Sequence, residues 1–175
     1  LVQEAQDAVP VHAQSALRSI VAQFHALVRE IGHLEKQILA WHRHDEVSQR
    51  LATVPGIGPI TASAIAATVP DASIFRSGRQ FAAWLGLTPR PHSSGGKERL
   101  GGITKQGDGY LRRLLVVGAT AVTRMTRKDR AKQPWLARLL ATKPAKIASV
   151  ALANKTARIA WVIMSRGEVY RSAAA

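Results

Sequence analysis

Residues 86–115 read GLTPRPHSSGGKERLGGITKQGDGYLRRLL. The first part of this stretch is rich in prolines and glycines, which interrupt regular structure, whereas its end has the apolar spacing of a helix. It therefore predicts a long glycine-rich loop over residues 86–109, with a short extended pair flanking the turn at residues 95–102. The next helix is predicted to begin at Asp108 or Gly109.

Two short helices are predicted before this loop. An alanine-rich run that follows Gly58 predicts the first of them, and Pro70 closes it. Residues 78–85 predict the second helix. Its buried face is predicted to consist of Phe81, Trp84 and Leu85. Neither segment shows the alternation that is typical of a strand.

Three further helices are predicted after the loop. The first has an inward stripe formed by Leu111, Leu114, Leu115, Gly118, Val122 and Met125. Gly118 allows a close helix crossing at this stripe. Residues 135–140 predict a short helix, and Pro144 opens a last helix that runs to about Arg166. The predicted fold class is therefore mainly α.

The first 46 residues predict a long helix. Its apolar residues recur at alternating steps of three and four: Leu17, Ile20, Phe24, Leu27, Ile31, Leu34, Ile38 and Trp41. This spacing is typical of a coiled-coil seam, so residues 1–46 are expected to form a connecting arm that joins copies of the chain. Because further apolar residues widen the stripe, the alternatives are packing on the chain's own domain or on a partner helix outside this chain. A helical domain over residues 47–170 and a frayed tail over residues 171–175 complete the predicted organisation.

The net charge of +14 is unevenly distributed along the chain. Residues 1–52 hold 5 basic and 6 acidic side chains, whereas residues 53–175 hold 20 and 5. This asymmetry indicates a polyanionic partner for the second part of the chain. Nucleic acid is favoured over a membrane surface, because the basic residues recur across several predicted elements instead of bordering one apolar face.

The amino-acid composition excludes several kinds of functional site. The absence of cysteine excludes thiolate zinc sites and cysteine nucleophiles, and it is compatible with a reducing cytoplasm. No uncharged apolar run approaches the roughly 18 residues of a membrane span. His42 and His44 are two residues apart, whereas helical metal ligands are spaced by three or four, so no metal site is predicted. The chain begins at Leu1 in helix-like sequence, which suggests a piece of a longer protein.

The segment Pro55-Gly56-Ile57-Gly58 lies between two helical runs and matches a helix-hairpin-helix signature. In such a turn the glycines let backbone amides approach a phosphate, and the following helix adds its N-terminal dipole. Gly56, Ile57 and Gly58 are therefore candidate contacts to a nucleic-acid backbone. A simple helix–helix turn is the alternative.

The loop itself carries Ser93 and Ser94 among many cations. A serine that attacks phosphorus needs positive charge on the nonbridging oxygens, and the candidates for that role are Lys97, Arg99, Lys105, Arg112 and Arg113. His92 is a candidate to accept the serine proton. The residues alone favour the alternative that the two serines form a turn or bind phosphate without reacting.

Ordered motifs extend from the Pro55–Gly58 turn through QFAAWLGLTP at residues 80–89 and ITKQG at residues 103–107 to Arg112. Together they resemble the C-terminal region of IS110-family transposases, closely over residues 54–125. The resemblance implies a DNA recombinase with a catalytic serine at the position of Ser94, Ser93 being its less favoured neighbour. It also implies an oligomer that acts on DNA, and some members use a structured guide RNA.

In that family an N-terminal RuvC-like domain supplies acidic residues that bind Mg²⁺. This half is absent from the chain, so no cofactor is expected here and the fragment alone is expected to be inactive. The resemblance therefore predicts the C-terminal portion of an insertion-sequence transposase that cleaves and rejoins DNA through Ser94. A non-catalytic helix-hairpin-helix DNA-binding module is the alternative.

Overall fold

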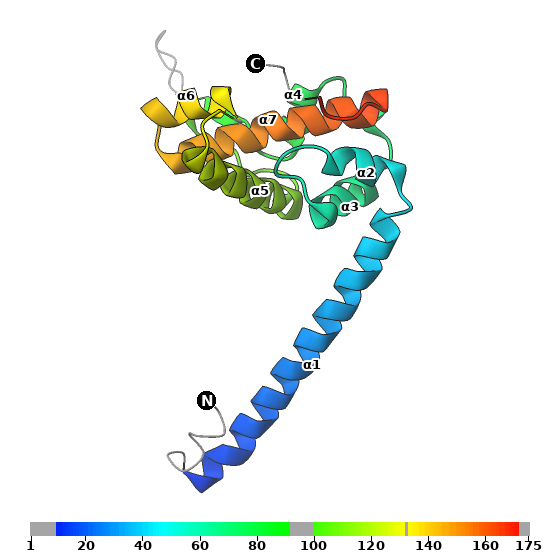
Figure 1. Cartoon of the computed structure of the whole chain (residues 1–175), viewed down its shortest axis with the longest axis vertical. Helices are drawn as coiled ribbons and strands as arrows, with labels where there is room; N and C mark the ends of the chain where they lie inside the picture. Colours follow the sequence, from blue (N-terminus) through cyan, green and yellow to red (C-terminus); the bar gives the residue numbers. More distant parts are fainter. Residues whose placement is uncertain (1–9, 92–99, 132, 172–175) are drawn as a thin grey trace. The chain divides into compact units, whose positions relative to one another are not determined.

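A computed structural model describes residues 10–91, 100–131 and 133–171, and it is mainly α, as predicted (Figure 1). The described elements are α1 (Val11–His42), α2 (Glu46–Ala52), α3 (Pro59–Thr68), the short 3-10 helix η2 (Ala72–Ile74), α4 (Gly78–Trp84), β1 (Pro89–Pro91), β2 (Leu100–Ile103), α5 (Gly109–Lys128), α6 (Pro134–Thr142) and α7 (Ala145–Arg166). The chain divides into two units, Leu1–Ala40 and Trp41–Ala175.

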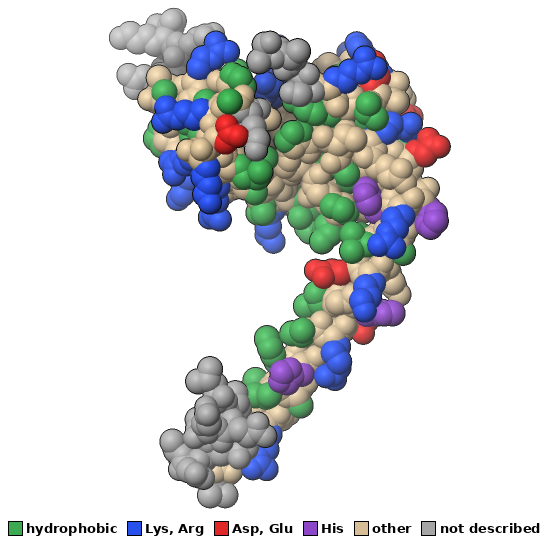
Figure 2. All heavy atoms as spheres, in the orientation of Figure 1, with side chains coloured by type: hydrophobic (Ala, Val, Ile, Leu, Met, Phe, Trp, Pro, Cys, Tyr) green, Lys and Arg blue, Asp and Glu red, His purple; other side chains and the backbone are tan. Residues whose placement is uncertain are grey.

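The first unit is dominated by α1, which is a single helix of 32 residues. Its seam side chains are exposed to solvent, namely Leu17, Ile20, Phe24, Leu27, Ile31 and Leu34. Figure 2 shows hydrophobic side chains along the surface of this helix. Most of the stability of a helix in a protein comes from burying its apolar face, and here that face is exposed. Pairing with a second copy stays a prediction.

The second unit is built around α7. This helix contacts α2, α4, α5, α6 and η2, while α3 packs on α2 and α5. Four alanines of α7 are fully buried, and their small side chains let the neighbouring helices approach closely: Ala148, Ala153, Ala157 and Ala160. Large side chains from the other helices complete the core, among them Leu51, Ile65, Phe81, Leu115 and Leu136.

Two predicted core positions are wrong. Met125 is 62% exposed, because the buried stripe of α5 instead runs through Leu111, Leu115, Ala119, Val122 and Thr126. The Thr126 hydroxyl donates to the Val122 carbonyl, so this polar side chain is buried with its hydrogen bond made. Trp84 is 37% exposed at the edge of the aromatic cluster that it forms with Phe75 and Phe81.

The extended pair predicted in the glycine-rich loop is present as an antiparallel hairpin. Pro89 pairs with Ile103 and Pro91 with Leu100. The second strand begins earlier than expected, since it includes Gly101 and Gly102, which the sequence assigned to the turn. The hairpin therefore frames residues 92–99, which lie outside the described residues.

Backbone contacts attach the base of this hairpin to α4. The Thr104 amide donates to the Thr88 carbonyl at 2.9 Å, and the Lys105 amide donates to the Gly86 carbonyl at 3.1 Å. Gly107 has a φ of +95°, and a Cβ at this position would overlap the Trp84 carbonyl oxygen. The GLTP and ITKQG segments thus form one structural unit in which a backbone approach requires glycine.

Helix boundaries follow the capping signals. Asp108 accepts a hydrogen bond from the Leu111 amide, so α5 begins at Gly109 as predicted. Pro144 is the N-cap of α7, not its first helical residue as predicted, and the left-handed Gly167 ends that helix after Arg166. α6 extends two residues beyond the predicted end, to Thr142.

By length and composition alone, α7 is apolar enough to cross a membrane. Its apolar residues are those that build the core of the second unit, including Leu152 and Ile163. Its exposed positions include Lys146, Lys155 and Arg158. The hydropathy of α7 therefore has an explanation in the packing of this unit.

Candidate nucleic-acid interface

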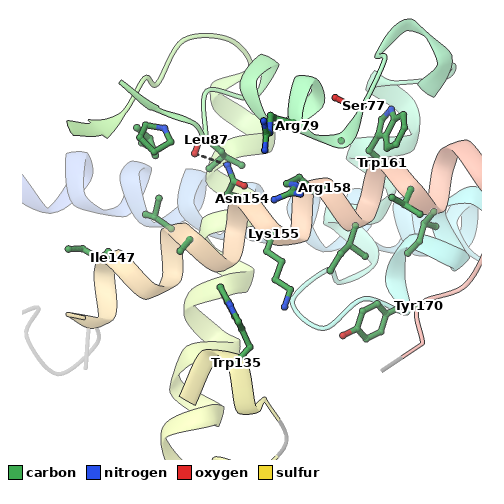
Figure 3. A pocket seen from close by; sticks show the side chains of 18 of the residues that line it. Ser77, Arg79, Leu87, Trp135, Ile147, Asn154, Lys155, Arg158, Trp161 and Tyr170 are labelled. Carbon is green, nitrogen blue, oxygen red and sulfur yellow. Dashed lines mark hydrogen bonds between the residues drawn. The ribbon is translucent and has the colours of Figure 1, made fainter. Parts of the chain in front are cut away.

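A large groove follows the exposed face of α7 (Figure 3). Its volume is about 2220 Å³. One wall is formed by the start of α4 and by the β1–β2 hairpin, and the opposite side includes Trp135 of α6. Residues 168–171, which follow α7, close one end. All of these segments belong to the second unit.

Cations dominate the ionisable side chains of this groove. Among the described lining residues there are eight basic side chains and one acidic side chain, Glu168. Three basic residues come from the α4 and hairpin wall: Arg79, Arg90 and Lys105. The others come from the approach to α7, from α7 itself and from the end of the chain: Lys143, Lys146, Lys155, Arg158 and Arg171. All eight are exposed, so the groove attracts anions.

The hairpin wall is held in place by specific contacts. The Arg90 guanidinium donates to the Thr104 carbonyl at 2.7 Å, across the two strands. The Asn154 amide of α7 donates to the Leu87 carbonyl at 3.0 Å. Lys105 has a left-handed backbone with a φ of +58°, which is uncommon for a residue with a side chain. This conformation belongs to the turn that leads the chain out of the hairpin.

Close packing also fixes the start of α4 against α7. A Cβ on Gly78 would lie 2.9 Å from the Arg158 carbonyl oxygen, so only glycine fits between these two helices. Ser77 caps α4 by accepting a hydrogen bond from the Gln80 amide. Arg79 and Arg158 lie on the same side of α7 in Figure 3. The two guanidinium groups therefore come from elements that are rigidly joined.

Aromatic side chains lie beside these cations. The ammonium of Lys155 lies 4.3 Å from the centre of the Trp135 ring, within the range of a cation–π interaction. The Trp161 indole donates to the Ala72 carbonyl at 3.1 Å. Tyr170 lies at the end of the groove, where its amide donates to the Thr53 hydroxyl. Basic and aromatic groups together are suited to a nucleic acid.

The turn at residues 53–58 joins α2 to α3 and has two different glycines. Gly56 has a φ of +92° and packs against the backbone of Gly118, so it serves the contact between this turn and α5. Ile57 is buried. Gly58 is exposed and caps α3, and among the described residues no atom contacts the position that a Cβ on this residue would occupy. This leaves space for a ligand at the start of α3.

This turn adjoins one end of the groove. A small cavity is lined by Val54 and Pro55 on one side and by Lys155, Ile159 and Tyr170 on the other. The last three residues also line the large groove. The predicted phosphate-binding turn and the basic groove are therefore neighbours, although Gly56, Ile57 and Gly58 do not themselves line the groove.

The two arginines at the start of α5 differ in their surroundings. Arg112 is half-buried, and its guanidinium donates to the Leu85 carbonyl at 2.9 Å. Arg113 is exposed. Neither residue lines the groove, whereas Lys105 does. The remaining predicted site residues lie outside the described residues: His92, Ser93, Ser94, Lys97 and Arg99. Both strands that lead into this segment line the groove.

Three of the described carboxylates cap the starts of helices. Asp45 accepts from the Ser48 amide, and Asp71 and Asp108 cap η2 and α5. Hydrogen bonds from Ser73 lower the pKa of Asp71, and the bond from the hydroxyl has a larger effect than the bond from the amide. No group of three potential metal-ligating side chains occurs in the part of the chain that the structure describes.

A histidine network near the start of the second unit was missed from the sequence. His42 Nδ1 lies 2.6 Å from the hydroxyl oxygen of Ser48, which is fully buried and lies 3.3 Å from that of Ser63. From the sequence, His42 was considered only as a metal ligand and was rejected in that role. Residues 41–46, which include His42, fall in the second unit.

The α7 wall of the groove was also missed, although its signal is present. Lys155 and Arg158 are exposed and spaced by three, and half-buried Ala151 and Asn154 line the groove beside them. A helical projection of residues 145–166 would have placed these cations on one face. The contributions of Arg79 and Trp135 depend on tertiary packing and have no local signature.

Comparison with known proteins identifies the family. Residues 48–134 match the model of the Transposase IS116/IS110/IS902 family. The chain is 52% identical over 164 residues to a Pseudomonas aeruginosa protein named "Probable family 20 transposase", covering 93% of this chain and 48% of that protein. It is 43% identical over 145 residues to the transposase for insertion sequence element IS1111A of Coxiella burnetii, covering 82% of this chain and 40% of that protein.

A more distant relative is the pilin gene-inverting protein of Moraxella bovis, which is 29% identical over 93 residues, covering 51% of this chain and 28% of that protein. The chain thus spans less than half the length of these curated relatives. The matched region contains the turn at residues 53–58, the β1–β2 hairpin and α5. The chain belongs to the IS110 family of insertion-sequence transposases.

Proposed function

We propose that this chain is the DNA-binding, serine-bearing C-terminal portion of a recombinase that cleaves and rejoins DNA strands. The observation that carries the proposal is that the two strands leading into the Ser94 segment line a groove with eight basic side chains and one acidic side chain in its described part. A nucleophile delivered from such a hairpin meets a phosphate that the surrounding cations already hold.

The proposed reaction is a reversible transfer of a phosphodiester. The Ser94 oxygen forms a bond to phosphorus while the bond from phosphorus to one deoxyribose oxygen breaks. The serine proton passes to a base, for which His92 is the candidate, and the released deoxyribose oxygen takes up a proton. In rejoining, a deoxyribose hydroxyl attacks the serine phosphodiester and the serine hydroxyl is restored. No energy-rich co-reactant is needed, because one ester is exchanged for another.

The described cations divide into two roles under this proposal. Lys105 and Arg90 stand at the base of the hairpin, where they can neutralise a phosphate beside the reacting one. Arg112 joins α5 to the end of α4 through the Leu85 carbonyl, so it positions the loop. Lys97 and Arg99 follow the serine closely in sequence and remain the candidates to stabilise charge in the transition state.

The acidic residues for a metal-dependent step are proposed to come from a RuvC-like domain in the remainder of the protein. The support for this division of labour is the resemblance to the family, together with the share of its relatives that this chain spans. We also propose that α1 joins copies of the chain, that the protein acts in the cytoplasm, and that DNA, in some members with a guide RNA, is its partner. The resemblance to the family supports the proposals on the cytoplasm and on DNA as the partner.

A second candidate function is a non-catalytic helix-hairpin-helix module. It is favoured by Gly58, which opens α3 at an exposed position with free space around it. Such a module would hold duplex DNA by its backbone, without breaking it. It requires no serine.

Substitution of the two serines separates these functions. Ser94→Ala in the full-length protein is expected to abolish strand exchange while leaving DNA affinity within about twofold, because the hydroxyl acts on the bond and not on binding. Ser93→Ala is the matched control and is expected to retain exchange. Exchange by Ser94→Ala at the wild-type rate would exclude the serine mechanism and leave the non-catalytic module.

A further inference from the structure

We propose that the α7 groove binds an unpaired DNA strand, with bases over its apolar floor and phosphates along its basic edges. This inference rests on the proposed function, since a single strand that is cleaved and then joined to a different duplex must leave its own. It adds the state of the DNA at this surface and the residues that select that state.

The floor of the groove is the first argument. It contains exposed Ile147 and half-buried Val150 and Val162, all from the face of α7 that the core does not cover. A duplex presents phosphates and sugars to such a surface and keeps its bases stacked inside, so these apolar side chains would gain little from it. Unpaired bases expose apolar ring faces, which such a floor can cover.

The arrangement of charge is the second argument. In Figure 3, Arg79 and Arg158 lie on the hairpin side of α7, and Lys155 lies on the α6 side. Basic side chains of the groove therefore lie on both the hairpin side and the α6 side of α7, which we call its basic edges. A single strand has its phosphates on one side and its bases on the other, so it can follow one edge while its bases cross the floor.

Trp135 supplies the third argument. Its ring is 37% exposed, lines the groove and has the Lys155 ammonium 4.3 Å from its centre. A base that stacks on the exposed part of this indole brings its phosphate close to Lys155, so one nucleotide contacts both residues. An acidic protein segment would be attracted by the same edges, but it could stack on Trp135 only where it carries an aromatic side chain, whereas every nucleotide carries a base.

The groove also has a defined direction relative to the hairpin. Its hairpin wall includes Pro89, Arg90 and Gly102, which adjoin the segment that carries Ser94. Its other end reaches Tyr170, beside the turn at residues 53–58. A strand along α7 would therefore connect the proposed cleavage loop with the turn proposed to hold a DNA backbone.

The test measures binding of the whole chain to fluorescein-labelled 20-nucleotide oligomers by fluorescence anisotropy. Three oligomers of one mixed sequence are compared: single-stranded DNA, duplex DNA and single-stranded RNA. Single-stranded DNA is expected to bind at least tenfold more tightly than duplex and no more weakly than RNA. Duplex binding that is equal or tighter, tighter RNA binding, or no binding to any oligomer would overturn the inference.

Trp135→Leu tests the stacking contact, since it keeps an apolar side chain and removes the ring. It is expected to weaken single-strand binding about fivefold or more while changing duplex binding by less than twofold. Trp84→Leu is the matched control, because Trp84 has the same exposed fraction of 37% and does not line the groove. Circular dichroism shows whether each variant is folded. Equal losses in the two folded variants, or loss of duplex and single-strand binding alike in Trp135→Leu, would overturn the inference.

Competition with an acidic amphipathic peptide tests the alternative occupant. The peptide is expected to displace single-stranded DNA weakly and with no dependence on Trp135, and displacement that Trp135→Leu abolishes would overturn the inference. Failure here is distinguishable from failure of the proposed function. If Ser94→Ala loses strand exchange but the chain shows no preference for single strands, the serine mechanism stands and the single-strand inference fails. If the chain prefers single strands but Ser94→Ala exchanges strands normally, the inference stands and the serine mechanism fails.

Discussion

Gly118 of α5 and Gly56 of the turn at residues 53–58 meet backbone to backbone, and a Cβ on Gly118 would overlap the Gly56 carbonyl oxygen. This contact attaches the proposed DNA-binding turn to the longest helix that flanks the glycine-rich loop in sequence. Val122, one turn further along α5, also contacts the position where a Cβ of Gly56 would lie. The conformation of the turn is therefore determined by α5.

Gly118→Ala is expected to lower the free energy of unfolding by about 1–3 kcal/mol, because the added methyl group overpacks a backbone contact. Thermal denaturation followed by circular dichroism should show a midpoint several degrees lower. Gly102→Ala is the control, since no atom of the described part of the chain lies within 4 Å of its Cβ position. An unchanged midpoint for Gly118→Ala would contradict the close approach.

The adjacent arginines of α5 are expected to respond differently to the same substitution. Arg112→Gln removes a charged hydrogen bond to the Leu85 carbonyl and should cost about 1–3 kcal/mol of stability. Arg113→Gln alters an exposed side chain and should change stability by less than about 0.5 kcal/mol.

Their effects on DNA binding provide a second readout. If Arg113 contacts a phosphate, Arg113→Gln lowers the slope of log affinity against log salt by about 1. Titrations at several salt concentrations measure this slope, which should be steep for the wild-type chain. A flat salt response of the wild-type chain would contradict binding through the basic surface, and an unchanged slope in Arg113→Gln would remove that residue from it.

The exposed seam of α1 is expected to join copies of the chain. Leu27→Lys places a charge on the seam and should lower the mass measured by sedimentation equilibrium, because it interrupts an apolar contact between helices. Ala22→Lys adds the same charge away from the seam and should leave the mass unchanged. A monomeric wild-type chain, or one whose mass does not respond to Leu27→Lys, would reassign the seam to a contact with another protein segment.

Asp71 provides a test of helix capping through pH. Hydrogen bonds from the Ser73 hydroxyl and amide favour the ionised carboxylate, so the folded-state pKa of Asp71 is lowered. This contribution to stability is present above the unfolded pKa and is lost as the pH falls through the folded value. Nuclear magnetic resonance should show that Ser73→Ala raises the pKa of Asp71 toward its ordinary value, whereas Ser165→Ala leaves it unchanged. No rise in Ser73→Ala would contradict the capping contact.

Local signals were sufficient to predict most of the helices. Asp108 caps α5 at the predicted position, and the apolar spacing from Leu17 to Trp41 corresponds to one continuous helix. The inward face of α5 was predicted less well, because Thr126 hides its hydroxyl in a bond to Val122 and replaces the exposed Met125 in the core. The spacing of apolar residues cannot reveal a buried polar side chain whose hydrogen bond is made within its own helix.

The candidate site was harder to predict than the fold. Lys105 was predicted and does line the groove, but Arg112 makes a contact with the backbone of α4 that joins residues 27 apart in sequence. Arg79, Trp135 and Arg158 come from three helices, and only the packing of those helices against one another shows that they share a surface. Such convergence cannot be read from the spacing of residues within one segment.

Mapping the covalent intermediate tests the central claim most directly. The full-length protein is allowed to react with its DNA, quenched with detergent, and digested with a protease and a nuclease, and the peptides that retain nucleotide are sequenced by mass spectrometry. We expect a nucleotide on the Ser94 oxygen and none in Ser94→Ala. Strand products that form without an adduct, or with the nucleotide attached to Ser93 or to another residue, would contradict the serine mechanism proposed for this hairpin.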